Sequence, residues 1–160
     1  MGVRWGVALS GVERLDAALR RTAVEVHNFR TPLRRTVDEV ARPSIARNFE
    51  IGGRPDPWQE LSDETIARKG SDRILVDTGQ GMRSATARAR WTITREQAAY
   101  VGSSFPERSW FMELHQRADD FDVAFPARPF AVVQPEDLDA MRGVFASWLD
   151  RDVIPRYTLG

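Results

Sequence analysis

Histidine and cysteine are the side chains that most often bind metals, and this 160-residue sequence contains two histidines and no cysteine. Because His27 and His115 are far apart, a structural zinc site has almost no ligands, and a catalytic zinc would need carboxylates from distant segments. The glycines around Gln80 form a segment too short for a phosphate-binding loop, and no lysine follows it. The sequence also lacks a Gly-x-Ser-x-Gly motif. We therefore expect no metal and no other cofactor.

One short motif could nevertheless support catalysis. The segment Ile74-Leu75-Val76-Asp77-Thr78-Gly79 resembles the loop of retropepsin-like aspartic proteases, in which two chains each supply an aspartate and the pair activates water. Three features oppose this alternative: Gln80 follows the glycine, the flanks read as helices, and no apolar-apolar-glycine segment follows. We favour a structural role, in which Asp77 or Thr78 caps a helix that begins near Gly79.

Helical periodicity dominates the first fifty residues. After a short strand at residues 5–9, Ser10 and Glu13 form a capping-box pattern that begins an amphipathic helix ending near His27. A second helix is expected from Thr31-Pro32 to Gly52-Gly53, with a kink or break at Pro43 because proline removes a backbone donor. The two apolar stripes are Val12, Leu15, Leu19, Thr22, Ala23 and Val26, and then Leu33, Val37, Val40, Ala41, Ile45 and Phe49.

The middle of the chain combines short helices with a small sheet. Residues 62–70 predict a capped helix that ends at a glycine, and residues 77–85 predict one or two further helical turns. Apolar and polar residues alternate from Ala87 to Ile93, which is typical of a strand with one buried face. Residues 95–97 could form the turn to a partner strand over residues 98–103.

The remaining residues complete an α+β fold. Residues 105–116 are rich in aromatic side chains and are expected to be helical after Pro106, and an amphipathic helix begins at Pro135 with acidic residues in its first turn. Its apolar stripe is Leu138, Met141, Phe145, Trp148 and Leu149. We predict a single domain over residues 1–160, with N-terminal helices packed on a small antiparallel β-sheet and a C-terminal helix.

The overall composition is that of a globular protein and excludes several classes of function. Hydrophobic residues make up 42% and charged residues 29% of the chain. The 23 basic and 23 acidic residues cancel, which argues against a nucleic-acid binder that depends on neutralising phosphates. No apolar run approaches the roughly 20 residues that span a bilayer, and residues 1–10 do not resemble a signal peptide. We expect no membrane partner and assembly in a cytoplasm.

A series of short motifs from Phe49 to Phe130, most of them after Trp58, carries a more specific resemblance. In order, these motifs are an aromatic residue, a Gly/Pro loop with a tryptophan and a following leucine, a threonine-rich helix, the Asp-Thr-Gly loop with its arginine, a Val-Gly step, a second aromatic residue, a His-Gln pair and a Pro-Ala-Arg-Pro-Phe block. The series resembles the phage virion morphogenesis (tail-completion) family, which includes Mu-like protein G. Here the motifs are Phe49, residues 52–58, Leu61, residues 65–69, residues 74–84 with Arg83, residues 101–103, Phe111, His115-Gln116 and residues 126–130.

The resemblance implies a structural virion protein of the head–tail junction rather than an enzyme. Such a protein would be a tail-completion or tail-terminator component that forms a homo-oligomeric ring, a hexamer, through head-to-tail subunit contacts. The ring would cap the tail tube protein and join it to neck or connector proteins. Phage DNA would pass through the lumen without specific binding, in keeping with the zero net charge.

The last motif, residues 125–130, also has a physical interpretation of its own. Prolines on both sides of Arg128 hold the backbone extended, so that Arg128 and Phe130 would lose little entropy on docking and are candidate interface anchors. An equally weighted alternative is an edge strand with Phe130 in the core and Arg128 paired to a carboxylate. We expect His115 to be a structural histidine, Trp58 and Trp91 to lie in the core, and Trp110-Phe111 to be exposed. The candidate interface and motif residues are Trp58, Asp77, Thr78, Gly79, Arg83, Trp110, Phe111, His115, Gln116, Pro126, Arg128, Pro129 and Phe130.

Overall fold

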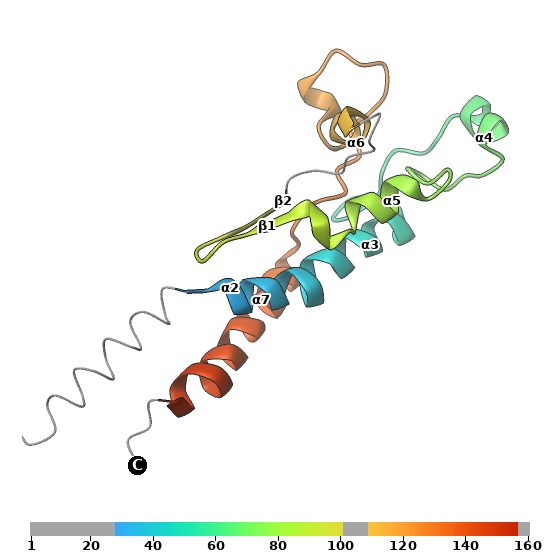
Figure 1. Ribbon diagram of the computed structural model, residues 1–160. Helices are drawn as coiled ribbons and strands as arrows, with labels where there is room; N and C mark the ends of the chain where they lie inside the picture. The colour runs from blue at the N-terminus through green and yellow to red at the C-terminus, as the bar shows by residue number, and fades with distance from the viewer. Residues whose placement is uncertain (1–27, 101–108, 157–160) are drawn as a thin grey trace, which may run out of the picture.

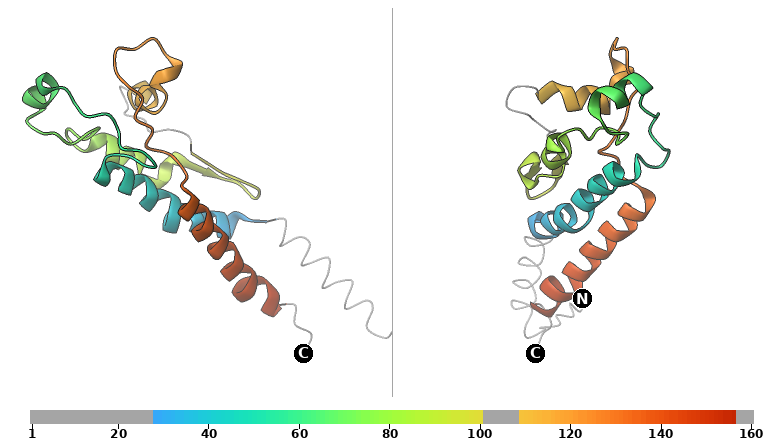
Figure 2. Two further views of the ribbon diagram at one scale, coloured as in Figure 1. Left: turned by 180° about the vertical axis from the view of Figure 1, so that it is seen from behind. Right: turned by 90° about the vertical axis from the view of Figure 1, so that its right-hand side faces the viewer.

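The computed structural model describes residues 28–100 and 109–156 (Figure 1). The first strand and first helix predicted from the sequence, and the end of the second strand of the sheet, lie outside these residues. The described elements form an elongated arrangement, in which α2 and α3 follow one line and α7 lies beside α2 (Figures 1 and 2). The shorter helices α4 and α5 gather near the α3 end.

The predicted second helix is confirmed, and it contains a π-helical turn. This helix, which we call the long helix, comprises α2 (Arg30–Thr36), a π-helical turn (Val37–Ala41) and α3 (Arg42–Ile51). The wider turn ends two residues before Pro43, which cannot donate the regular backbone hydrogen bond, and it is found where a kink or break was expected. Gly52 ends the helix with a φ of +80°. The predicted apolar stripe is buried at Val37, Val40, Ala41, Ile45 and Phe49.

The two short helices predicted in the middle of the chain are present. Helix α4 (Asp63–Lys69) begins at Ser62, whose hydroxyl accepts a hydrogen bond from the Thr65 amide at 3.3 Å. It ends at Gly70, which has a φ of +69°. Helix α5 (Gln80–Ala85) follows Gly79. The aromatic-rich segment forms helix α6 (Ser109–Gln116) in its described part.

The predicted hairpin is also present, but its first strand is shorter than expected. Strand β1 (Trp91–Ile93) pairs antiparallel with β2 (Ala98–Tyr100), so that Trp91 faces Tyr100. The extension of this strand back to Ala87 was wrong, because residues 88–90 form a 3₁₀ turn closed by the Arg90 amide on the Ala87 carbonyl. An ion pair of 3.1 Å between Arg88 and Asp38 holds this turn against the long helix. The alternating pattern that includes Arg88 and Arg90 therefore corresponds to a turn and not to a strand.

The C-terminal helix begins at the predicted residue. Helix α7 (Pro135–Trp148) continues into a π-helical turn (Leu149–Val153) and a 3₁₀ turn (Ile154–Arg156). Gln134 and Asp137 form a capping box at its start. Of the predicted stripe, Trp148 is buried, whereas Leu138 and Leu149 are exposed.

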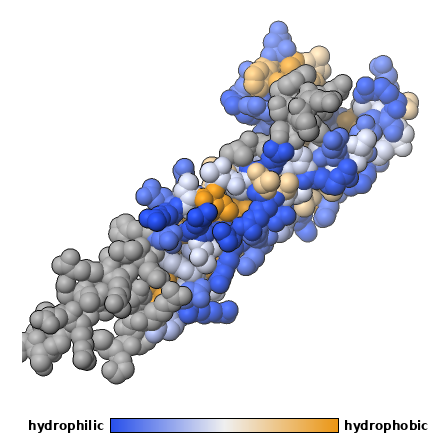
Figure 3. Space-filling view, viewed as in Figure 1, coloured by the Kyte–Doolittle hydropathy of each residue, from blue (hydrophilic) through white to orange (hydrophobic). Residues whose placement is uncertain are grey.

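The main hydrophobic core lies where α3 meets the loop segments and α5 and α6. The chain is thus of the α+β class, with helices and a small antiparallel sheet in the part that the structure describes. Its visible surface is mostly hydrophilic with a few hydrophobic areas (Figure 3), and no helix among residues 28–100 and 109–156 is long and apolar enough to cross a membrane. The core residues are Ile45, Phe49, Trp58, Val76, Ala85, Met112 and Phe130.

Candidate functional site

Residues 125–130, which we call the Pro-Arg-Pro segment, form hydrogen bonds to several distant parts of the chain. Its arginine, Arg128, is only 6% exposed. The Arg128 guanidinium donates from Nε and Nη2 to the Gln59 carbonyl, at 3.2 and 3.0 Å, and from Nη2 to the Glu60 carbonyl at 3.4 Å. The Arg128 amide donates to the His115 carbonyl at 2.7 Å. The side chain therefore holds the loop before α4, the backbone amide bonds to α6, and the side chain does not project outward as an anchor.

The end of the Pro-Arg-Pro segment is held just as firmly. Phe130 is 2% exposed, and its ring centroid lies 5.4 Å from that of Phe49. The amides of Phe130 and Ala131 both donate to Oε1 of Gln116 at 2.9 Å. Trp58 donates from Nε1 to the Pro129 carbonyl at 3.0 Å. These bonds satisfy the backbone within the chain, as burial requires.

Both interpretations of this segment need correction. An exposed anchor pair is wrong for the described conformation, because Arg128 and Phe130 are buried. The alternative correctly predicted Phe130 in the core. Its edge strand is not found, since residues 121–134 contain no strand. Its carboxylate partner is absent too, because in the described ranges the Arg128 guanidinium bonds to backbone carbonyls rather than to an acid.

His115 lies in the interior beside the same segment. Its ring centroid is 4.6 Å from that of Phe125, and only 9% of the residue is exposed. Burial, together with the positive charge of Arg128, lowers the pKa of His115 to about 4. The imidazole is therefore neutral near neutral pH, which suits a packed side chain.

The Asp-Thr-Gly loop lies between α4 and α5, and both Asp77 and Thr78 are exposed. The Thr78 hydroxyl accepts a long hydrogen bond of 3.4 Å from the Gln80 amide, while Gly79 occupies the N-cap position with a φ of +74°. The Arg83 guanidinium donates back to the Thr78 carbonyl at 3.3 Å. Thr78 thus makes the only contact of capping type here among the described residues, and capping by Asp77 is not seen. Helices flank the loop, in contrast to the strands that the protease alternative requires.

A buried polar network, which the sequence reasoning missed, connects α3 to the start of α7. Asn48, with no exposed surface, donates from Nδ2 to the Phe130 carbonyl at 2.7 Å and accepts from Nε of Arg54 at 2.7 Å. Arg54 also donates to the hydroxyl of Ser44 at 2.5 Å and pairs with Glu136 at 3.0 Å. A signal existed, because Ser44 and Asn48 are four residues apart and adjoin the apolar stripe at Ile45 and Phe49.

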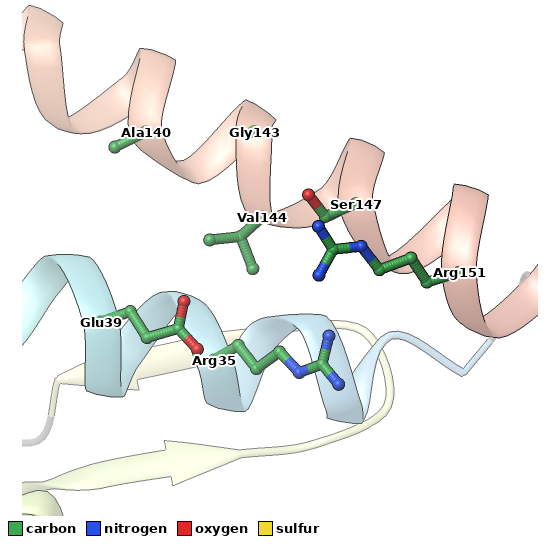
Figure 4. A pocket seen from close by; sticks show the side chains of 7 residues that line it. All are labelled: Arg35, Glu39, Ala140, Gly143, Val144, Ser147 and Arg151. Atoms are coloured by element: carbon green, nitrogen blue, oxygen red, sulfur yellow. The ribbon is translucent and has the colours of Figure 1, made fainter.

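An open groove of about 650 Å³ lies between the long helix and α7 (Figure 4). The long helix contributes the charged side chains of Arg35 and Glu39 to the groove lining. Helix α7 supplies mostly small residues, and the turn after it supplies the charged side chain of Arg151. No group of three or more metal-ligating side chains occurs in the described residues. The α7 side of the lining is Ala140, Gly143, Val144, Ser147 and Arg151.

The remaining motif residues are placed only in part. Trp58 is 6% exposed and packs in the core, as predicted, with its ring centroid 5.8 Å from that of Phe49. Trp91 is half-buried and packs beside the core. Trp110 and Phe111 lie on α6, but their side chains are outside the described part, so their exposure stays a prediction.

Comparison with known proteins shows the family to which the chain belongs. No family model and no solved structure matches it. The chain is 31% identical over 135 residues to the Mu-like prophage FluMu G protein 2 of Haemophilus influenzae, which covers 82% of this chain and 86% of that protein. The relative places the chain in the class of phage proteins. It belongs to the family of Mu-like prophage G proteins.

Proposed function

We propose that this protein is a structural component of the phage virion at the head–tail junction, where it acts as a tail-completion or tail-terminator protein. The observation that carries the proposal is the relationship to a Mu-like prophage G protein over most of both chains. The ordered motif series agrees with it, because the same motifs belong to the tail-completion family that the sequence resembles. The protein would act by association and not by catalysis.

Several residues of the motif series hold distant segments of the fold together. Trp58, Gln116 and Arg128 come from different parts of the chain, and each bonds to the backbone of another segment. They hold the loops and α6 on the core that surrounds Phe130. The motif residues would therefore keep each subunit rigid, while exposed surfaces of the helices make the subunit contacts. Six copies would close a ring through head-to-tail contacts.

The partners follow from this role. One face of the ring would contact the tail tube protein and the other a neck or connector protein, and the genome would pass through the lumen. Balanced charge suits a lumen that must not retain DNA, because strong binding to phosphates depends on an excess of basic residues.

The ring is tested by measuring the mass of the purified protein by light scattering, alone and with tail tube protein, and by imaging the same samples by electron microscopy. We expect a hexamer, either alone or on the end of tail tubes. A monomer under both conditions would contradict the ring.

The virion role is tested with a phage that lacks the gene. Heads and tails should accumulate separately, and the wild-type gene supplied from a plasmid should restore complete particles. If complete and infectious particles form without the gene, the head–tail role is wrong.

A further inference from the structure

Helix α7 has an apolar face that the described elements cover only at Phe145, where the Phe29 ring packs. Leu138 and Leu149 are 47% and 37% exposed, and the half-buried Phe145 lies seven and four residues from them, which places the three side chains on one face. Exposed apolar side chains grouped in this way usually mark a contact surface. The face is distinct from the groove of Figure 4, because Ala140 and Ser147 are two residues away from Leu138 and Leu149, about 200° around the helix.

The chain offers its own segment to cover this face. Residues 1–27 lie outside the described part, and their sequence predicts an amphipathic helix from Ser10 to about His27. This segment joins the described chain at Asn28, directly before Phe29. The Phe29 ring centroid lies 5.9 Å from that of Phe145 and 6.0 Å from that of Trp148. The segment therefore ends beside the uncovered face.

One pair of residues in each of the two apolar stripes has the same separation. Leu15 and Val26 are eleven residues apart, as are Leu138 and Leu149. At the rise of an α-helix, both intervals span about 16 Å. A helix that ends near Phe145 and runs in the same direction as α7 would place Val26 near Leu149 and Leu15 near Leu138. From this match we propose that residues 10–27 pack along the Leu138/Phe145/Leu149 face of α7 in the same chain.

The chain contains no cysteine, so engineered pairs can test the contact without background. The first pair is V26C with L149C, and its matched control is V26C with S147C, which moves the second cysteine to the groove face. Both full-length proteins are oxidised at low concentration and analysed on a non-reducing gel. We expect a high yield of the internally cross-linked monomer for the first pair and a much lower yield for its control. The pair L15C with L138C, controlled by L15C with A140C, tests the other end in the same way.

Each outcome decides the inference. Equal yields in the test and control pairs, or no cross-link in either, would overturn the proposed packing. Cross-linked dimers or larger species from the first pair, in place of the internally cross-linked monomer, would also overturn it. The result does not depend on the proposed virion role, since internal cross-links in a protein that never forms a ring would support the packing and contradict the ring.

Discussion

Asn48 is fully buried, yet both ends of its amide have partners from other parts of the chain. It donates to the Phe130 carbonyl and accepts from Arg54, so one side chain links α3, the loop after it and the Pro-Arg-Pro segment. A buried amide stabilises a fold when both groups are satisfied and is costly when either is not. Arg128 follows the same rule, because backbone carbonyls accept its hydrogen bonds in the absence of a carboxylate. At the scale of single residues, these polar contacts determine where the segment lies.

Gly53 should not tolerate a side chain. A Cβ at this position would lie 2.6 Å from Cδ1 of Trp58, and the φ of +110° is strained for other residues. We expect Gly53→Ala to lower the free energy of unfolding by about 2 kcal/mol or more. The control Gly52→Ala has a φ of +80° and no atom within 4 Å of the added Cβ, so it should cost only about 1 kcal/mol. Urea denaturation measures both values, and equal losses would contradict the close packing of Trp58 on Gly53.

His115 should make the stability depend on pH. Its pKa is lowered from 6.5 to about 4 in the folded chain, so the unfolded chain binds a proton at a higher pH than the folded chain. The contribution is therefore fully present above pH 6.5 and is lost as the pH falls from 6.5 towards 4. We expect His115→Gln, which keeps a polar side chain of similar size, to flatten this part of the profile in urea denaturation. Parallel profiles for the variant and the wild type would show that His115 does not titrate in this way.

At the scale of elements, the start of α7 is joined to α3 by buried polar bonds. Asp137, which is 7% exposed, accepts from the Ser44 hydroxyl at 2.5 Å and from the Gln134 amide at 2.9 Å with the same oxygen. The carboxylate thus caps its own helix and fixes the helix against its neighbour. The other end of this helix pair is held by aromatic packing of Phe29 on Phe145 and Trp148.

Removing this carboxylate should loosen the two helices. We expect Asp137→Ala to lower the free energy of unfolding by about 1–3 kcal/mol, because the cap is lost and Ser44 keeps no acceptor there. Asp139→Ala is the matched control, since its pair with Arg142 is exposed and should contribute about 0.5 kcal/mol or less. Thermal unfolding followed by circular dichroism compares the two variants. If both lose the same stability, the connection between α3 and α7 is not important for the fold.

At the scale of the whole molecule, apolar packing is uneven along the elongated shape (Figure 2). The core at the α3 end gathers the loops, α5 and α6 around Phe49 and Phe130. The α2 end instead has two helices with a polar groove on one side and exposed apolar residues on another. The described chain therefore has surface available for further contacts at one end, while the other end is already packed.

The exposed Asp77 should be dispensable for assembly. Helices flank its loop, and no second carboxylate contacts it in the described part of the chain, so we expect Asp77→Asn to leave ring formation and the joining of heads to tails unchanged. The measurement is complementation of the deletion phage by the variant, with the wild-type gene as control. Proteolysis of a generic substrate by the wild type that disappears in the variant would instead support the aspartic protease.

Much of the helical structure could be predicted from the sequence because its causes are local. The Ser62 cap and the Gly70 end of α4 depend on neighbouring residues, and the stripe from Val37 to Phe49 follows from helical periodicity. The π-helical turn before Pro43 was not predicted, because a missing donor can be accommodated by a break, a kink or a wider turn. Burial in the tertiary structure selects among them.

The sequence by itself determined the helices, the hairpin turn and the order of motifs that connects this chain to the Mu-like G proteins, since these depend on periodicity, capping and the identity of residues along the chain. Only the tertiary structure decided what the Pro-Arg-Pro segment does. The prolines make it extended, but whether Arg128 points outward or inward depends on the carbonyls of Gln59 and Glu60, nearly seventy residues away in sequence. Acceptors that distant come together only when the core around Phe130 forms, and no local pattern in the segment records them.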